Sequence, residues 1–258
     1  MSADTVVCGD ALEVLRDLPE ASVDLALFSP PYDDIRSERP MDMAYFRALG
    51  LALERVIKDG GWAVVVIANA SRELRTTLTW QRLCVDWVDN RGWSLLQELI
   101  YHRHGRPGGW NKRRFRPDHE VILPFFKGER FTTFDKEALY VSAKHAGKVW
   151  HGTQRHSDGS LSPIKPTKQA VTKCRGTVWT IPSSNTEGDR AKMAHHSTFP
   201  RRLASDLIRC FSRSGDLVLD PMCGSGTTLL AAQGLGRHYL GIDIEQKWVD
   251  LSLERLGR

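Results

Sequence analysis

Short apolar runs alternate with amphipathic stretches along most of this chain. Continuous apolar runs, as at residues 23–28 and 62–68, predict strands of a sheet that is covered on both faces. Residues 42–58 carry apolar side chains at helical spacing, and we expect that helix to end at Asp59-Gly60-Gly61. The expected strands are 6–7, 23–28, 62–68, 93–101, 120–126, 177–181, 217–219 and 239–242, and the expected helices are 11–18, 42–58, 74–90, 199–212, 227–234 and 246–256. This alternation predicts an α/β fold.

The alternation stops between about residues 127 and 176. Gly, Ser, Thr, Lys and His dominate there, and no long apolar period continues. We therefore expect an insertion at 128–176 that divides one α/β domain into two parts, residues 1–127 and 177–258.

Composition narrows the class of protein. The chain has 258 residues, of which 41% are hydrophobic, enough for one large α/β domain. Its longest apolar stretch, residues 63–68, is too short to cross a bilayer, and no signal-peptide pattern opens the sequence. Five scattered cysteines form no CxxC pair, which argues against a zinc site or another metal centre and against a disulfide framework. We expect a reduced, cytoplasmic protein with no membrane partner.

Positive charge gathers in two stretches of the chain. The net charge is +5, and residues 101–116 hold eight Lys, Arg and His with no acid, interleaved with Tyr101, Trp110 and Phe115. Residues 144–175 continue the basic trend. A single run of this kind is as often a solvated loop as a binding surface. Two such runs favour a polyanionic partner, because clustered cations release counterions and aromatic rings stack on bases.

A glycine-rich turn near the C-terminal end predicts a nucleoside site. Asp220 ends a strand, the sequence Gly224-Ser225-Gly226 follows, and Thr227 opens a helix. Glycines allow tight turns and close ligand approach. The next strand leads to Asp243, an acid at the offset expected for a ribose contact. The pattern is neither the G-x-G-x-x-G fingerprint nor a P-loop, so a strand-to-helix turn that simply needs glycine is the alternative.

A second unusual loop, Ser29-Pro30-Pro31-Tyr32, follows the strand expected at 23–28. Paired prolines hold the backbone rigid, so the Pro30 carbonyl is free of any ladder and can accept a hydrogen bond. The Ser29 hydroxyl is a second acceptor, and Tyr32 adds a flat ring. This set suits a planar heterocycle with an exocyclic amine, although a plain turn with a packed tyrosine would use the same residues.

Together the two loops resemble the DNA amino-methyltransferases, which use S-adenosyl-L-methionine to methylate cytosine N4 or adenine N6. Ser29 to Tyr32 match the family's catalytic [DNS]-PP-[YFW], and residues 220–228 match its cofactor motif DPF-x-GSGTT, with Met222 where Phe is usual. Residues 116–127 also resemble a family segment. The cofactor-binding residues that the resemblance implies are Asp220, Pro221, Met222, Cys223, Gly224, Ser225, Gly226, Thr227 and Asp243, together with Ser197, Thr198 and Phe199 ahead of the cofactor helix.

The order of the motifs is similar to the β-type arrangement of that family. The catalytic motif comes first, the insertion follows and the cofactor motif comes last, which implies a Rossmann-like methyltransferase sheet in permuted order with an inserted target-recognition region. The resemblance also implies double-stranded DNA as partner, base flipping, and a homodimer as one arrangement. Ser29 in first position goes mostly with cytosine N4 in the family, and Asp with adenine N6, so cytosine N4 is our first expectation and adenine N6 the second.

We expect DNA contacts from seven basic residues: Arg103, Arg106, Lys112, Arg113, Arg114, Lys148 and Arg155. Three other functions fit parts of the pattern. They are a DNA-binding protein that holds the cofactor without transfer, an NAD oxidoreductase, and a methyltransferase that acts on RNA or protein amides. The sequence gives equal weight to an orphan enzyme and to one linked to a restriction nuclease.

Overall fold

The computed structural model describes residues 3–31, 42–104, 113, 115, 117–182 and 200–258. It divides into two compact units, Met1–Asp135 with Thr177–Arg258, and Lys136–Gly176. No helix among the described residues is long and apolar enough to cross a membrane.

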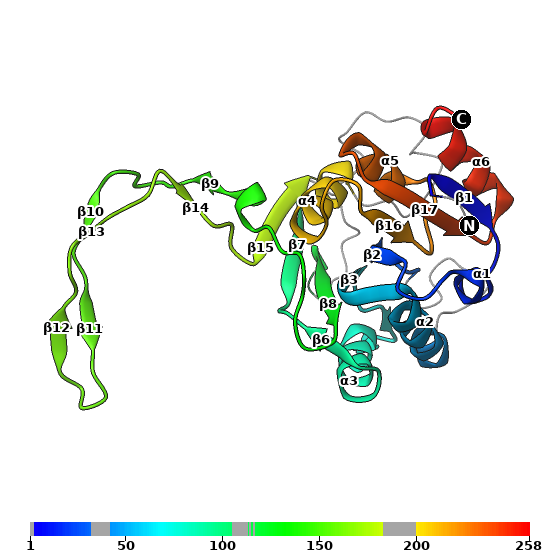
Figure 1. Cartoon of the computed structure of the whole chain (residues 1–258). Coiled ribbons are helices and arrows are strands. Elements are labelled where there is room, and N and C mark those ends of the chain that lie inside the picture. The colour runs from blue at the N-terminus through cyan, green and yellow to red at the C-terminus, as the bar shows by residue number, and fades with distance from the viewer. Residues whose placement is uncertain (1–2, 32–41, 105–112, 114, 116, 183–199) are drawn as a thin grey trace. The chain divides into compact units, whose positions relative to one another are not determined.

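A mixed sheet is the centre of the larger unit (Figure 1). Within the described residues its strand order is β1-β17-β16-β2-β3-β8-β7-β15, with β6 also paired to β8. The strands are β1 (Thr5–Cys8), β2 (Val23–Phe28), β3 (Ile57–Ile67), β6 (Trp93–Leu95), β7 (Leu99–His104), β8 (His119–Lys127), β15 (Val178–Pro182), β16 (Leu217–Asp220) and β17 (His238–Asp243). The five strands from β1 to β3 run parallel, and β8 is antiparallel to both of its neighbours β3 and β7. The permuted α/β fold that the sequence predicted is confirmed.

Helices cover both faces of this sheet. They are α1 (Ala11–Asp17), α2 (Met43–Val56), α3 (Thr79–Asn90), α4 (Arg201–Phe211), α5 (Thr227–Gly234) and α6 (Gln246–Arg255). The helices α1, α2 and α3 pack side by side, and their core includes Ala26 and Phe28 of β2. Leu25 and Leu27, which point to the other face, are equally buried. Burial of both faces explains why β2 and β3 are near-continuous apolar runs.

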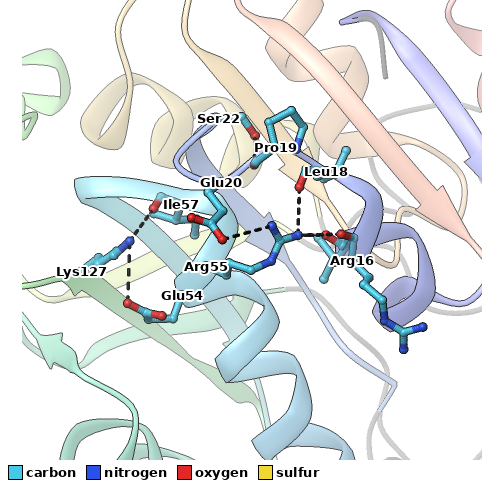
Figure 2. Close-up of polar contacts among 10 residues, drawn as sticks. Arg16, Leu18, Pro19, Glu20, Ser22, Glu54, Arg55, Ile57 and Lys127 are labelled. Carbon is cyan, nitrogen blue, oxygen red and sulfur yellow. Dashed lines mark hydrogen bonds and ion pairs between the residues drawn. The ribbon is translucent and has the colours of Figure 1, made fainter.

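Charged side chains close the amino end of β2 (Figure 2). Arg55 of α2 donates to the carbonyls of Leu15, Arg16 and Leu18 at the end of α1. The last carbonyls of a helix lack the usual amide partners. Here the Leu15 carbonyl also accepts from the Leu18 amide at 3.3 Å, and one guanidinium serves all three carbonyls. Lys127 donates to the carbonyl of Ile57 and lies 3.7 Å from Glu54. The amino ends of β2 and β3 are therefore fastened by structural contacts.

Three predicted boundaries are wrong. The helix expected over 42–58 ends at Val56, and the strand begins directly at Ile57. Asp59, Gly60 and Gly61 lie inside that strand, where the register with β2 shifts between the pairs Val23–Ile57 and Leu25–Trp62. Gly60 has φ +74°, and a side chain there would meet Thr132, so the glycine serves a bulge and not a helix end.

The other two differences lie in the next stretch of chain. The helix expected over 74–90 begins at Thr79, because Ser71–Arg72 and Arg75–Thr76 pair as a small hairpin, β4 and β5. The strand expected over 93–101 is two strands, β6 and β7, which both pair with β8.

The smaller unit is built from three short two-stranded pairings. These are β9 (Val141–Ser142) with β14 (Thr172–Lys173), β10 (Val149–Trp150) with β13 (Thr167–Lys168), and β11 (Thr153–Arg155) with β12 (Leu161–Pro163). A single 3-10 turn, Glu137–Leu139, precedes them. The unit starts at Lys136 and not at 128, because the aromatic rings of Phe131 and Phe134 pack around Trp62 of β3.

Candidate functional site

The two loops singled out in the sequence lie at the same edge of the sheet. Ser29 follows the end of β2, and Asp220 ends the neighbouring parallel strand β16, in a register that pairs Leu219 with Ala26. Asp220 in turn lies beside Gly241 of β17, two residues before Asp243. Because carboxyl ends of parallel strands meet at one edge, the arrangement matches the usual crevice for ligands in α/β sheets.

Asp220 and Asp243 hold the glycine-rich turn by its backbone. Asp220 Oδ1 accepts from the amide of Met222 at 3.0 Å, and Asp243 Oδ2 accepts from the amide of Gly224 at 2.8 Å. The amide of Cys223 donates to the carbonyl of Ile242 at 2.9 Å. The turn is thus tied to both strands that flank it, and its backbone shape is set before any ligand arrives.

Close packing explains why this turn uses glycine. Gly226 has φ +75°, and a Cβ there would lie 2.8 Å from Ser252 Oγ. Gly241, on the neighbouring strand, has no room either, since a Cβ would lie 2.4 Å from Leu229 Cδ1. These glycines are required by close contact within the protein, as a strand-to-helix turn that simply needs glycine would also require.

The last helix, α6, holds the glycine-rich turn through two side-chain hydrogen bonds. These contacts were not predicted from the sequence. Ser252, fully buried, donates from Oγ to the carbonyl of Gly224 at 2.8 Å. Arg255, one turn further, donates to the carbonyl of Ser225. No motif marks these two residues, because the signal is a tertiary contact between segments almost thirty residues apart.

Burial sets the electrostatics of this edge. It raises the pKa of Asp220 to about 7, against the lowering effects of the neighbouring Thr228 side chain and of the hydrogen bond from the Met222 amide. Burial also raises the pKa of Asp243. The pKa of the Cys223 thiol lies well above its ordinary value, mainly through burial and then through Asp220 and Asp243. Cys223 is therefore a neutral packing residue and not a thiolate nucleophile.

The strand β1 also reaches this edge, another feature that the sequence reading did not assign. Cys8 pairs with Asp243, and the amide of Gly9 donates to the Asp243 carbonyl at 2.9 Å. Asp10 then caps α1 by accepting from the amide of Leu12. The sequence signal that could have placed β1 at this edge is a short apolar strand followed by Gly-Asp at a helix start.

The remaining candidate residues are placed as follows. Pro30 is buried, whereas Ser29 and Pro31 are half-buried at the end of β2. Met222 is half-buried and packs against the core beneath α1 to α3. Seven candidates lie outside the described residues: Tyr32, Ser197, Thr198 and Phe199 of the ligand site, and Arg106, Lys112 and Arg114 of the basic stretch.

The described basic candidates fall in both units. Arg103 is largely buried, with Nη1 3.1 Å from Glu120 Oε1 and Nη2 donating to the carbonyl of Pro117. That ion pair gives Arg103 a structural role in β7. Arg113 is exposed, and Lys148 and Arg155 are exposed in the unit Lys136–Gly176.

Comparison with known proteins identifies the family. Residues 23–254 match the family model described as DNA methylase, which groups N6 and N4 methyltransferases. The chain belongs to this DNA methylase family. It is 30% identical over 250 residues to the orphan methyltransferase M.BamHII of Bacillus amyloliquefaciens, covering 93% of this chain and 91% of that protein. It is 28% identical over 262 residues to the DNA adenine methyltransferase YhdJ of Escherichia coli, covering 98% and 83%.

Solved structures agree with this assignment. The PvuII DNA methyltransferase, titled cytosine-N4-specific, superposes with a TM-score of 0.76 at 20% identity, over 99% of this chain and 86% of that one. A DNA modification methylase of Thermus thermophilus, solved in complex with S-adenosyl-L-methionine, matches with a TM-score of 0.65 at 26% identity, over 98% and 93%. A protein of similar fold has thus been solved with that cofactor bound.

The glycine-rich turn of this methylase fits such a cofactor. Gly224 puts no side chain between its backbone and a ligand, and the N-terminal amides of α5 have no partner within the helix. The Thr227 hydroxyl is buried and has no hydrogen-bond partner among the described residues. A buried hydroxyl without a partner is costly, so a polar ligand at this turn would stabilise it.

Proposed function

We propose that this methylase binds S-adenosyl-L-methionine at the turn 220–227 and transfers its methyl group to cytosine N4 of a flipped base in double-stranded DNA. The observation that carries the proposal is the parallel register of β2 and β16, since it sets Ser29-Pro30-Pro31 beside that turn. An acceptor loop for an amine and a cradle for a nucleoside cofactor then face one crevice.

The acceptors of the catalytic loop would act on the amine. A base inside a duplex cannot reach this crevice, so it must be flipped out. The amine would donate to Ser29 Oγ and to the Pro30 carbonyl, and Tyr32 would stack on the ring. With both hydrogens held, the nitrogen becomes pyramidal and its lone pair is exposed for attack. When bound, the cofactor would supply an electrophilic methyl group: its carbon–sulfur bond would break as the nitrogen–carbon bond forms, and the amine would lose one proton to solvent. The protein's contribution is then positioning and fixed dipoles.

The acids of the turn would hold the cofactor's nucleoside end. Asp243 keeps lone pairs on both oxygens beyond the amides of Gly224 and Glu245, which suits ribose hydroxyls. The end of β1, at Gly9 and Asp10, would border the same pocket.

The choice of base rests on Ser29. A serine, with its neutral hydroxyl, at this position goes mostly with cytosine N4 in this family. The adenine relative from Escherichia coli makes adenine N6 the second candidate. Nucleoside mass spectrometry of DNA methylated by the purified enzyme tests this directly. We expect N4-methylcytosine, and a product containing N6-methyladenine alone would overturn the choice of base while leaving the transfer mechanism standing.

The Tyr32→Ala variant tests the site itself. Loss of the stacking ring should reduce methyl transfer by at least about a hundredfold, because the flipped base loses its platform. Binding of S-adenosyl-L-homocysteine, followed by calorimetry, should stay within about twofold of wild type. Full transfer activity in this variant would contradict the assigned catalytic loop.

A further inference from the structure

Nearly all of the chain's excess positive charge lies in the smaller unit. Residues 136–176 contain eight Lys and Arg and two acids, a formal charge of +6. The rest of the chain contains 28 Lys and Arg and 29 acids, a formal charge of −1. A charge asymmetry of this size marks the smaller unit as the part that meets a polyanion.

That unit is a two-stranded β-ribbon and not a packed domain (Figure 1). Backbone hydrogen bonds continue between its short strands, as from Ile164 to Gly152 at 2.8 Å and from Gln169 to Lys148 at 2.9 Å. Trp150 lies across Gly152, where a Cβ would come within 2.9 Å of the indole Nε1 and 3.5 Å of Ile164. The ribbon is thus shaped by its own backbone pairing and one aromatic contact.

The two faces of the ribbon tip differ in chemistry. The tip pairs Gln154 with Ser162 and Arg155 with Leu161, and side chains alternate between faces along each strand. A ring nitrogen of His156 lies 2.8 Å from Ser162 Oγ, which places His156 on the face of Gln154 and Ser162. We call these three residues the polar face. The opposite face carries Thr153, Arg155 and Leu161.

The family resemblance implies that this insertion is the target-recognition region; we propose that, within it, the polar face of the ribbon tip reads base edges in the major groove of the target DNA and so determines the methylated sequence. The proposal rests on the proposed function, since it names the element that chooses the site of methyl transfer. The three side chains of the polar face carry both donors and acceptors, as direct readout of base edges requires. Arg155 and the lysines at the base of the tip, Lys148 and Lys168, bind phosphates on the groove walls.

The dimensions of the ribbon favour duplex DNA over duplex RNA. The major groove of B-DNA is about 12 Å wide and admits a two-stranded β-ribbon. Paired strands lie about 4.8 Å apart, so two strands with their side chains fill that width. The major groove of an A-form RNA helix is too narrow for side chains to read. A ribbon with a cationic base and a face of hydrogen-bonding side chains therefore fits DNA.

Methylation of a randomised DNA library, followed by sequencing of the methylated sites, tests the polar face. In Gln154→Ala and in His156→Ala we expect the preference at one or two positions of the site to fall by about tenfold, the value of one lost base contact. The matched control is Thr153→Ala, on the same strand but the opposite face, which should keep the wild-type preference. All three side chains are exposed, so melting temperatures should not change.

The Arg155→Ala and Lys168→Gln variants test the phosphate contacts. Each should weaken binding to specific and non-specific DNA by the same factor and reduce the slope of log affinity against log salt by about one. DNA with 7-deazapurines in the target site, which lack the N7 acceptor of the major groove, should bind the wild type more weakly. Stronger binding to a duplex RNA than to DNA would contradict the choice of partner.

The outcomes separate this inference from the proposed function. Wild-type protein that methylates no DNA would remove the proposed function itself. Wild-type protein that methylates a defined site, with the same site preference in Gln154→Ala and His156→Ala, would overturn the polar face alone. A change of preference in Thr153→Ala instead would show that the opposite face reads the bases.

Discussion

The cofactor turn and the ribbon tip both contain an aspartate that accepts a hydrogen bond from the backbone two residues ahead. The pKa values of these two aspartates are shifted in opposite directions. In the cofactor turn, Asp220 accepts from the amide two residues ahead, that of Met222; at the ribbon tip, Asp158 accepts from the amide two residues ahead, that of Ser160. Each turn also contains a glycine with positive φ, Gly226 and Gly159. Yet burial raises the pKa of Asp220 to about 7, whereas hydrogen bonds from Ser160 lower the pKa of exposed Asp158.

The difference between the two pKa shifts reflects which elements contact each turn. The cofactor turn is held by β16, β17 and α6, so each of its groups has a fixed neighbour. The ribbon turn is held by its own backbone and by Ser160, with nothing within 4 Å of a Cβ placed on Gly159. A rigid, buried turn suits a cofactor of constant shape. An exposed turn tolerates substitution, which suits a surface that chooses a sequence.

Substitutions of Gly226 in the cofactor turn and of Gly159 in the ribbon turn should give the largest difference in stability. Gly226→Ala adds strain at positive φ and a collision with Ser252, and should cost about 2–5 kcal/mol of unfolding free energy as well as most cofactor binding. Gly159→Ala, the matched control, adds only the backbone strain of about 1–2 kcal/mol. Urea denaturation and calorimetry with S-adenosyl-L-homocysteine measure both effects. Equal losses of stability in the two variants would show that the cofactor turn is not closely packed.

The two aspartates should give opposite dependence of stability on pH. Asp220 binds its proton more tightly when folded, so stability should fall as pH rises from about 4 to about 7, by about 2–4 kcal/mol. Asp220→Asn should remove that slope, because the neutral amide does not titrate. The pKa of Asp158 is lowered in the folded protein, so its contribution to stability is present at pH values above the pKa of the unfolded chain and is lost as the pH falls. Urea unfolding at several pH values, with carboxyl NMR titration, measures both; an ordinary pKa for Asp220 would contradict its burial.

Substitutions of Ser252 in the cofactor site and of Ser160 at the ribbon tip should give the smallest difference in stability between the two turns. Ser252→Ala leaves the Gly224 carbonyl buried without its donor, a cost of about 1–3 kcal/mol, and should weaken S-adenosyl-L-homocysteine binding about tenfold by loosening the turn. Ser160→Ala removes a hydroxyl that donates to Asp158 at an exposed site, and should change stability by less than about 0.5 kcal/mol. Melting curves and calorimetry on both variants decide it. Unchanged cofactor affinity in Ser252→Ala would show that α6 does not shape the cofactor site.

Local patterns predicted the elements well where one signal was strong. The strand at 23–28 and the helix at 227–234 have the predicted bounds, because a continuous apolar run and a glycine-bounded helix start are unambiguous. The turn at Asp59-Gly60-Gly61 was misread, since glycine with positive φ serves a bulge as readily as a helix end. That choice depends on the partner strand β2, which lies far away in the sequence.

By itself, the sequence determined the two loops and their order along the chain, because each loop is marked by residues within a few positions of one another. The tertiary structure alone decided what those loops touch. It set the loop that begins at Ser29 beside the turn that follows Asp220, through the pairing of β2 with β16, and it brought Ser252 into contact with the Gly224 carbonyl. It also gave Arg103 a buried partner, Glu120, while it left Arg155 exposed. Burial and long-range register arise only when distant segments pack, so no local pattern could report them.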